Sequence, residues 1–150
     1  MTPAASIRSF MEAKKLALVG ASRSGRKFGN MVLNELTAKG YTVYPVHPGA
    51  QYIADQKCYS SLAELPESVG GVVVVVKPDQ SEIVVRDAYA AGIPRVWLQQ
   101  GAESASALAY CEQNGIDAIS RECILMHAEP VQSIHAVHRF FRRLFGRMPK

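Results

Sequence analysis

The chain has 150 residues, 48% hydrophobic and 20% charged, which is typical of one globular domain and excludes a disordered chain. Its apolar stretches are too short to cross a bilayer, and residues 1–15 lack the continuous apolar core of a secretory signal. The net charge of +4 arises at one end, because residues 139–150 carry five of the 17 basic residues and no acidic one. The rest is close to neutral, which argues against a nucleic-acid partner. We therefore expect a single cytoplasmic domain over residues 1–150.

Short apolar runs alternate with segments of helical periodicity, a pattern that predicts βαβ units and a parallel sheet. We expect strands at residues 16–21, 42–46, 71–77 and 95–98, with a weaker fifth strand at 117–120. We expect helices at residues 28–39, 81–91 and 104–114, each followed by a glycine, and a shorter helix at 61–66 begun by a serine cap. The five valines at 72–76 are typical of a central strand covered on both faces. The predicted fold is α/β: a doubly wound, mostly parallel, five-stranded Rossmann-like sheet with helices on both faces.

The end of the first predicted strand has the features of a phosphate-binding loop. Small residues form the turn into the next helix, and three cations follow: Gly20, Ala21 and Ser22, then Arg23, Arg26 and Lys27. Backbone N–H groups left free at the start of a helix, with the positive end of its dipole, attract a phosphorylated ligand. The loop differs from that of nucleotide hydrolases, in which a lysine and then a hydroxyl residue directly follow the second glycine. The alternative is a turn that only packs strand against helix, with solvated basic side chains.

The ends of the next strands supply further candidate contacts. At the end of the second strand, NAD sites usually place Asp or Glu to accept from the ribose hydroxyls, whereas this chain has Val46, His47 and Pro48. No carboxylate there rejects a phosphorylated ribose, so His47 either lies beside a phosphate or simply ends the strand. Lys77, after the third strand, either adds a cation to the same edge or only reaches solvent. After the fourth strand, polar groups of a ligand can be met by Gln99, Gln100 and Gly101.

These strand ends resemble a known family. The segments V-G-A-S, K-F-G-N, V-Y-P-V-H-P, W-L-Q-Q-G-A-E-S and R-E-C-I resemble the stand-alone coenzyme A-binding proteins, which are similar to the amino-terminal domain of the succinyl-coenzyme A synthetase alpha subunit. The resemblance covers roughly residues 5–128 and implies a coenzyme A site across the strand ends. It implies that the phosphates are held by Gly20, Ala21, Ser22, Arg23 and Lys27. It also implies that the adenine and pantetheine path is lined by Pro45, Val46, His47, Val76, Lys77 and Pro78.

The sequence shows no arrangement of catalytic residues. No Ser/His/Asp set, pair of carboxylates or activated cysteine can be assembled from it. The three cysteines have no C-x-x-C spacing, which disfavours both a disulfide framework and a metal site. Cys123, expected with Arg121 at the end of the fifth strand, is either a small buried thiol or one that forms a mixed disulfide with coenzyme A.

We therefore expect a non-catalytic module that binds coenzyme A or acyl-coenzyme A, with a carrier, sensor or regulatory role. One alternative is an NAD(P)-binding redox sensor or oxidoreductase on the same scaffold, with Arg23 or Lys27 meeting a 2′-phosphate. Another is an interaction scaffold acting through a basic amphipathic helix predicted at residues 131–148. The simplest interpretation packs this helix on the domain; the others give it a membrane surface, nucleic acid, a second copy of the chain or a protein partner.

Overall fold

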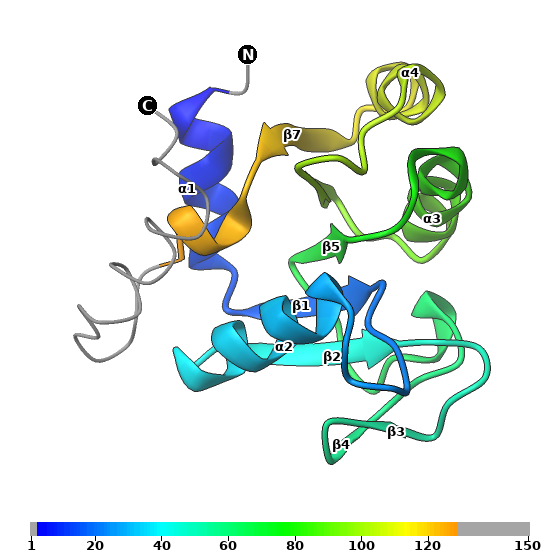
Figure 1. Cartoon of the computed structure of the whole chain (residues 1–150). Helices are drawn as coiled ribbons and strands as arrows, with labels where there is room; N and C mark the ends of the chain where they lie inside the picture. The colour runs from blue at the N-terminus through cyan, green and yellow to red at the C-terminus, as the bar shows by residue number, and fades with distance from the viewer. Residues whose placement is uncertain (1–2, 129–150) are drawn as a thin grey trace.

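The computed structural model describes residues 3–128 and shows a doubly wound α/β fold (Figure 1). A five-stranded parallel sheet has the strand order β2-β1-β5-β6-β7. The strands are β1 (Lys15–Val19), β2 (Thr42–Val46), β5 (Gly71–Val74), β6 (Arg95–Gln99) and β7 (Asp117–Glu122). The helices are α1 (Ala4–Glu12), α2 (Phe28–Ala38), α3 (Pro78–Ala90) and α4 (Ala105–Gln113). The predicted fold class is confirmed. The chain adds β2 on one side of β1 and then β5, β6 and β7 on the other side, so the strand order reverses between β1 and β5.

Two hydrophobic cores lie on opposite faces of the sheet, because neighbouring residues of a strand point to opposite sides. One core joins α1 and α2 to strand residues that include Leu18 and Trp97. The other joins α3 and α4 to strand residues that include Ala17 and Leu98. Figure 1 shows α3 and α4 together on one side of the sheet and α1 on the other. The helices therefore cover both faces and leave the carboxyl ends of the strands open.

The valine run forms the centre of the sheet, as its composition predicts. Every residue of β5 is buried, and β5 lies between β1 and β6. Both β1 and β5 end earlier than predicted, at Val19 and Val74, because β1 turns away at Gly20 and leaves β5 without a full partner. This early end frees residues 75–77 to turn toward the loop that follows β1.

Helix α3 begins three residues before its predicted start. Pro78 occupies its first turn, where a proline costs no hydrogen bond, and Lys77 is the N-cap residue. Ser81 therefore lies inside the helix, fully buried, and its hydroxyl donates to the carbonyl oxygen of Ala102 at 2.5 Å. This bond ties α3 to the loop that leads from β6 to α4.

Several elements differ from the sequence prediction. Residues 61–66 hold a single 3-10 turn, Leu62–Glu64, and Ser61 makes no side-chain cap bond. Helix α1, a second 3-10 turn at Ile124–Met126 and a hairpin of β3 (Tyr52–Ile53) and β4 (Gln56–Lys57) were not predicted. The predicted helix at 131–148 lies outside the described residues. Within residues 3–128, no helix is both long and apolar enough to cross a membrane.

The packing of α1 depends on a glycine in β5. The Phe10 ring lies edge-on to Trp97, with 5.3 Å between ring centroids, and both side chains are fully buried. A Cβ atom built on Gly71 would come within 2.4 Å of the Phe10 ring. The absence of a side chain at Gly71 is therefore what lets α1 reach the sheet.

We predict that Gly71→Ala lowers the free energy of unfolding by about 1–3 kcal/mol, because the added methyl group overpacks the contact between α1 and β5. Chemical denaturation of the two proteins measures this difference. Gly49→Ala is the matched control, since its Cβ would meet only the His47 ring, at 3.4 Å. Equal losses in the two variants would contradict the interpretation.

Candidate functional site

A cleft of about 840 Å³ opens at the carboxyl ends of β1, β2, β5 and β6. Its lining includes most of the residues singled out from the sequence: Gly20, Ala21, Ser22, Lys27, Val46, His47, Val76, Lys77, Pro78, Gln99 and Gly101. Arg23, Arg26 and Pro45 do not line it: the two arginines are exposed in the neighbouring loop, and Pro45 is buried within β2. The lining also contains residues that the sequence did not single out, among them Phe28, Gly29 and Gln80.

The loop after β1 lies in direct contact with the start of α2. Gly20 has a φ of +131°, and a Cβ atom there would meet the carbonyl oxygen of Val75 at 2.1 Å. A Cβ atom on Gly29 would meet the carbonyl oxygen of Gly20 at 2.5 Å. No residue other than glycine fits either position without moving the backbone. The first turn of α2 therefore approaches the end of β1 as closely as two backbones can.

A buried side chain, Asn30, holds this loop in place. The backbone N–H of Ser22 donates to Asn30 Oδ1, and Asn30 Nδ2 donates to the carbonyl oxygen of Ser22, both at 2.9 Å. The Ser22 hydroxyl lies 3.2 Å from the same Oδ1 atom, and Asn30 is only 1% exposed. No role for Asn30 was predicted from the sequence, because its partner is the backbone of a residue eight positions earlier.

Two helices begin at the cleft with a lysine at the N-cap. Lys27 precedes α2 and Lys77 precedes α3, and neither side chain caps its helix, because an ammonium group cannot accept a hydrogen bond. Helix α4 starts at the same sheet edge but has its own cap: the Ser104 hydroxyl accepts from the backbone N–H of Ala107 at 3.1 Å. The first turns of α2 and α3 can therefore accept an anion where α4 already has a cap.

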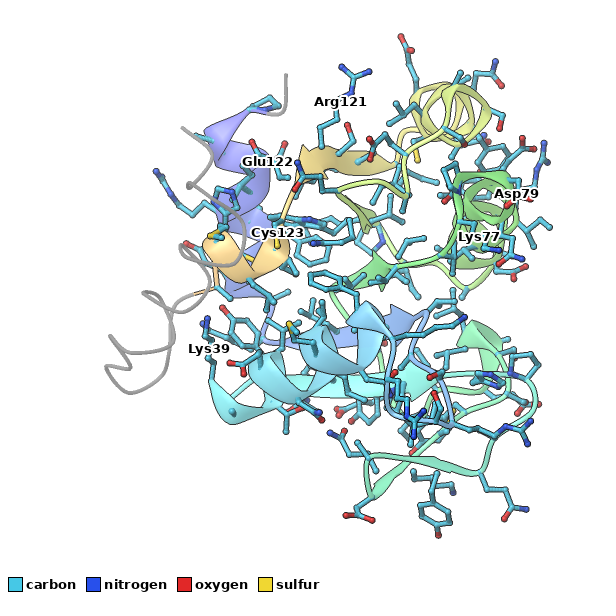
Figure 2. All side chains as sticks on the ribbon, in the orientation of Figure 1. Lys39, Lys77, Asp79, Arg121, Glu122 and Cys123 are labelled. Carbon is cyan, nitrogen blue, oxygen red and sulfur yellow. The ribbon has the colours of Figure 1, made fainter. Side chains whose placement is uncertain are left out.

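The two lysine-capped helices differ in one charge. The first turn of α3 contains Asp79, whereas the first turn of α2 contains no acidic residue. Figure 2 shows Lys77 and Asp79 together at the start of α3. The carboxylate of Asp79 offsets part of the positive potential there. The start of α2 is thus the more strongly anion-attracting of the two.

His47 follows directly after β2 and is fixed by its neighbours. Its backbone N–H donates to the carbonyl oxygen of Tyr59 at 2.9 Å, which ties it to the chain that returns from the β3–β4 hairpin. Its ring atom Nδ1 accepts from the backbone N–H of Gly49 at 2.9 Å. Beyond it lies a second hollow of about 640 Å³, which shares Pro48 with the cleft and is lined by Lys57, among others.

Gln99 lines the cleft, but its side-chain amide forms hydrogen bonds with residues that lie outside the cleft. Its Oε1 atom accepts from the backbone N–H of Ile124 and its Nε2 atom lies 3.0 Å from Cys123 Sγ, with Gln99 only 2% exposed. Gln99 thus separates the cleft from Cys123. Arg121 and Cys123, expected at the end of the fifth strand, do not line the cleft, and Cys123 is a small buried thiol, the first of the two alternatives. Figure 2 shows Cys123 beside the 124–126 turn, away from Lys77.

The three cysteine thiols are buried and form no disulfide bond. Cys58, Cys111 and Cys123 are all free, and burial raises the pKa of Cys58 and raises that of Cys111 to about 11. A raised pKa keeps a thiol protonated at neutral pH and therefore weakly nucleophilic. Within residues 3–128, no group of three or more His, Cys, Asp or Glu side chains is placed to hold a metal ion.

Comparison with known proteins identifies the class to which this fold and cleft belong. Residues 14–129 match the family model described as CoA binding domain, and the chain belongs to this family. A conserved hypothetical protein from Pyrococcus furiosus is similar in structure, with a TM-score of 0.70 and 41% identity; the match covers 73% of this chain and 95% of that one.

Curated relatives include both a short protein and a large enzyme. The uncharacterized protein YneT of Bacillus subtilis is 28% identical over 112 residues, covering 75% of this chain and 83% of YneT. The ADP-forming acetate–CoA ligase II of Archaeoglobus fulgidus is 33% identical over 72 residues, covering 47% of this chain. That match spans 11% of the ligase's own length. The chain therefore resembles only a small part of the enzyme and most of the short proteins.

We predict that Asn30→Ala lowers the free energy of unfolding by about 1–3 kcal/mol, because it leaves the N–H and carbonyl of Ser22 without their partner. Urea denaturation measures the loss. Asn34→Ala serves as the control, since Asn34 lies exposed on the same helix. If both variants lose the same stability, the bonds between Asn30 and Ser22 do not hold the loop.

Proposed function

We propose that this protein binds coenzyme A or an acyl-coenzyme A in the cleft at the strand ends, without catalysing a reaction, as a carrier, sensor or regulatory module. The observation that carries the proposal is the loop after β1, a preformed glycine turn beside a helix start that has a lysine instead of a cap. Membership of the CoA binding domain family supports the same ligand. The cleft volume of about 840 Å³ is within the range of pockets that hold small molecules and cofactors.

The diphosphate is assigned to the start of α2. The first two residues of α2, Phe28 and Gly29, line the cleft, so the backbone N–H groups of this first turn lie at its edge, and Lys27 adds a formal charge. Arg23 and Arg26 are exposed in the same loop, and their long side chains can turn toward a bound phosphate. Helix α3 is the weaker choice because Asp79 occupies its first turn.

The rest of the ligand extends from the diphosphate in two directions. In doubly wound sheets the ligand crosses the strand ends where the strand order reverses, here between β1 and β5. We place the adenosine over the end of β2, against Val46 and His47, with buried Pro45 supporting that strand. The pantetheine then crosses the ends of β5 and β6, along Val76, Lys77, Pro78, Gln99 and Gly101.

The composition of the cleft supports a binding role rather than catalysis. Its lining contains no Asp, Glu or Cys, so no carboxylate or thiol is present there as base or nucleophile. The Ser22 hydroxyl is paired with Ser24 at 2.8 Å and with Asn30, and neither partner is a base. The similarity of this chain to short, stand-alone proteins also fits a non-enzyme.

We predict that Lys27→Glu weakens the affinity for coenzyme A at least about tenfold, because it places a negative charge beside the diphosphate. The melting temperature should stay within about 2 °C of the parent, since Lys27 is exposed. Calorimetric titration with coenzyme A, acetyl-coenzyme A, NADH and NADPH measures the affinities, and thermal melting checks the fold.

Arg8→Glu is the matched control for this experiment. It makes the same change of charge on α1, which does not line the cleft, and should leave the affinity unchanged. Binding of NADPH without binding of coenzyme A would overturn the proposed function and favour a redox role on the same scaffold. Equal affinity in Lys27→Glu and the parent would remove the phosphate assignment from the loop after β1.

A further inference from the structure

The end of β2 carries an unusual residue for a doubly wound nucleotide site. Sites for NAD place a carboxylate there, which accepts from the ribose hydroxyls and repels a phosphate on the ribose. In this chain the position belongs to His47, and the lining of the cleft contains no Asp or Glu. A nucleotide at this strand end therefore meets an imidazole ring, and not a carboxylate that accepts hydrogen bonds from the ribose hydroxyls.

The hydrogen bonds of His47 determine what its ring can offer. A backbone N–H can only donate, so Nδ1 must be the acceptor of the bond from Gly49, at 2.9 Å. The ring hydrogen consequently lies on Nε2. A histidine in this form presents a hydrogen-bond donor, and not an acceptor, to a ligand in the cleft. A ribose phosphate oxygen accepts such a bond.

The backbone of His47 is held by the chain that returns from the β3–β4 hairpin. Its N–H donates to Tyr59, and the N–H of Tyr59 donates to the carbonyl oxygen of Pro45 at 3.0 Å, so the returning chain clamps the end of β2. The His47 carbonyl oxygen lies 3.8 Å from Cys58 Sγ. These contacts leave the ring little freedom to turn, which lowers the entropy cost of forming one further bond.

We infer that His47 reads the 3′-phosphate on the ribose of coenzyme A, donating to it from Nε2. The inference rests on the proposed function, and it adds that the site selects ligands with a phosphorylated ribose. The acidic group in the adjoining hollow, Glu64, accepts a hydrogen bond from the Ser60 hydroxyl at 2.5 Å. Lys57 in the same hollow gives the phosphate a cationic neighbour.

The test compares coenzyme A with dephospho-coenzyme A, which lacks only the 3′-phosphate, by calorimetric titration of the full chain. The parent protein should bind coenzyme A about ten- to a hundredfold more tightly, the range of one charge-assisted hydrogen bond in a half-buried place. His47→Asn keeps an acceptor near Nδ1 for Gly49 and removes the donor at Nε2. This variant should bind both ligands with affinities within about twofold of each other.

His47→Gln is the complementary variant, because its amide keeps an N–H near the place of Nε2. It should retain a large part of the preference for coenzyme A. Each comparison is a ratio within one protein, so a small loss of stability in a variant does not affect it; thermal melting confirms that each is folded.

The outcomes separate this inference from the proposal on which it rests. If the parent binds both ligands equally, or if His47→Asn keeps the full preference, His47 does not read the phosphate and the inference fails while coenzyme A binding stands. If the parent binds neither ligand, the proposed function fails as well. A preference lost in His47→Asn and retained in His47→Gln supports the inference.

Discussion

The close approach of two backbones, at Gly20 and Gly29, is the constraint on which the cleft depends. A side chain at either position would collide with a carbonyl oxygen, at 2.1 Å from Val75 or 2.5 Å from Gly20. Because α2 begins so near the end of β1, the first turn of α2 lies directly at the carboxyl ends of the strands, where it lines the cleft. Asn30 then fixes the intervening loop by bonding both polar groups of the Ser22 backbone. The loop is thus shaped before any ligand arrives, which lowers the cost of binding.

The sheet could be predicted because burial leaves a strong pattern in the sequence. The unbroken valines of β5 are buried on both faces, and the apolar run of β2 ends where it was expected, at Val46. Helix α1 leaves a weak pattern, since its buried residues are only Phe10 and Met11. The β3–β4 hairpin turns through Ala54 and Asp55, both at positive φ, instead of through the Asn-Gly pair that marks such turns in a sequence. Neither element therefore has a sequence pattern strong enough to predict it.

The cleft was largely predictable for a different reason. In a parallel sheet the carboxyl ends of all strands lie at one edge. The residues that follow each strand in the sequence can therefore be predicted to line the cleft without any knowledge of distances. What the sequence does not give is the direction of each side chain. Pro45 lies in β2 and is buried, and the amide of Gln99 turns away from the cleft toward Ile124. The role of Asn30 was missed because its partner is a backbone eight residues earlier, which no side-chain pattern reveals.

The three helices that start along this edge differ in how their N-termini are capped. Ser104 caps α4 from within the chain and so satisfies a backbone N–H that would otherwise need water or a ligand. At α2 and α3 the same position is a lysine, which gives up that stabilisation and places a positive charge where the helix dipole is already positive. Two like charges at one place repel each other, and an anion beside them turns this repulsion into a shared attraction. In the proposed complex, the bound anion relieves this unfavourable arrangement, most strongly at the start of α2, whose first turn lacks an acidic residue and whose preceding loop is held by Asn30.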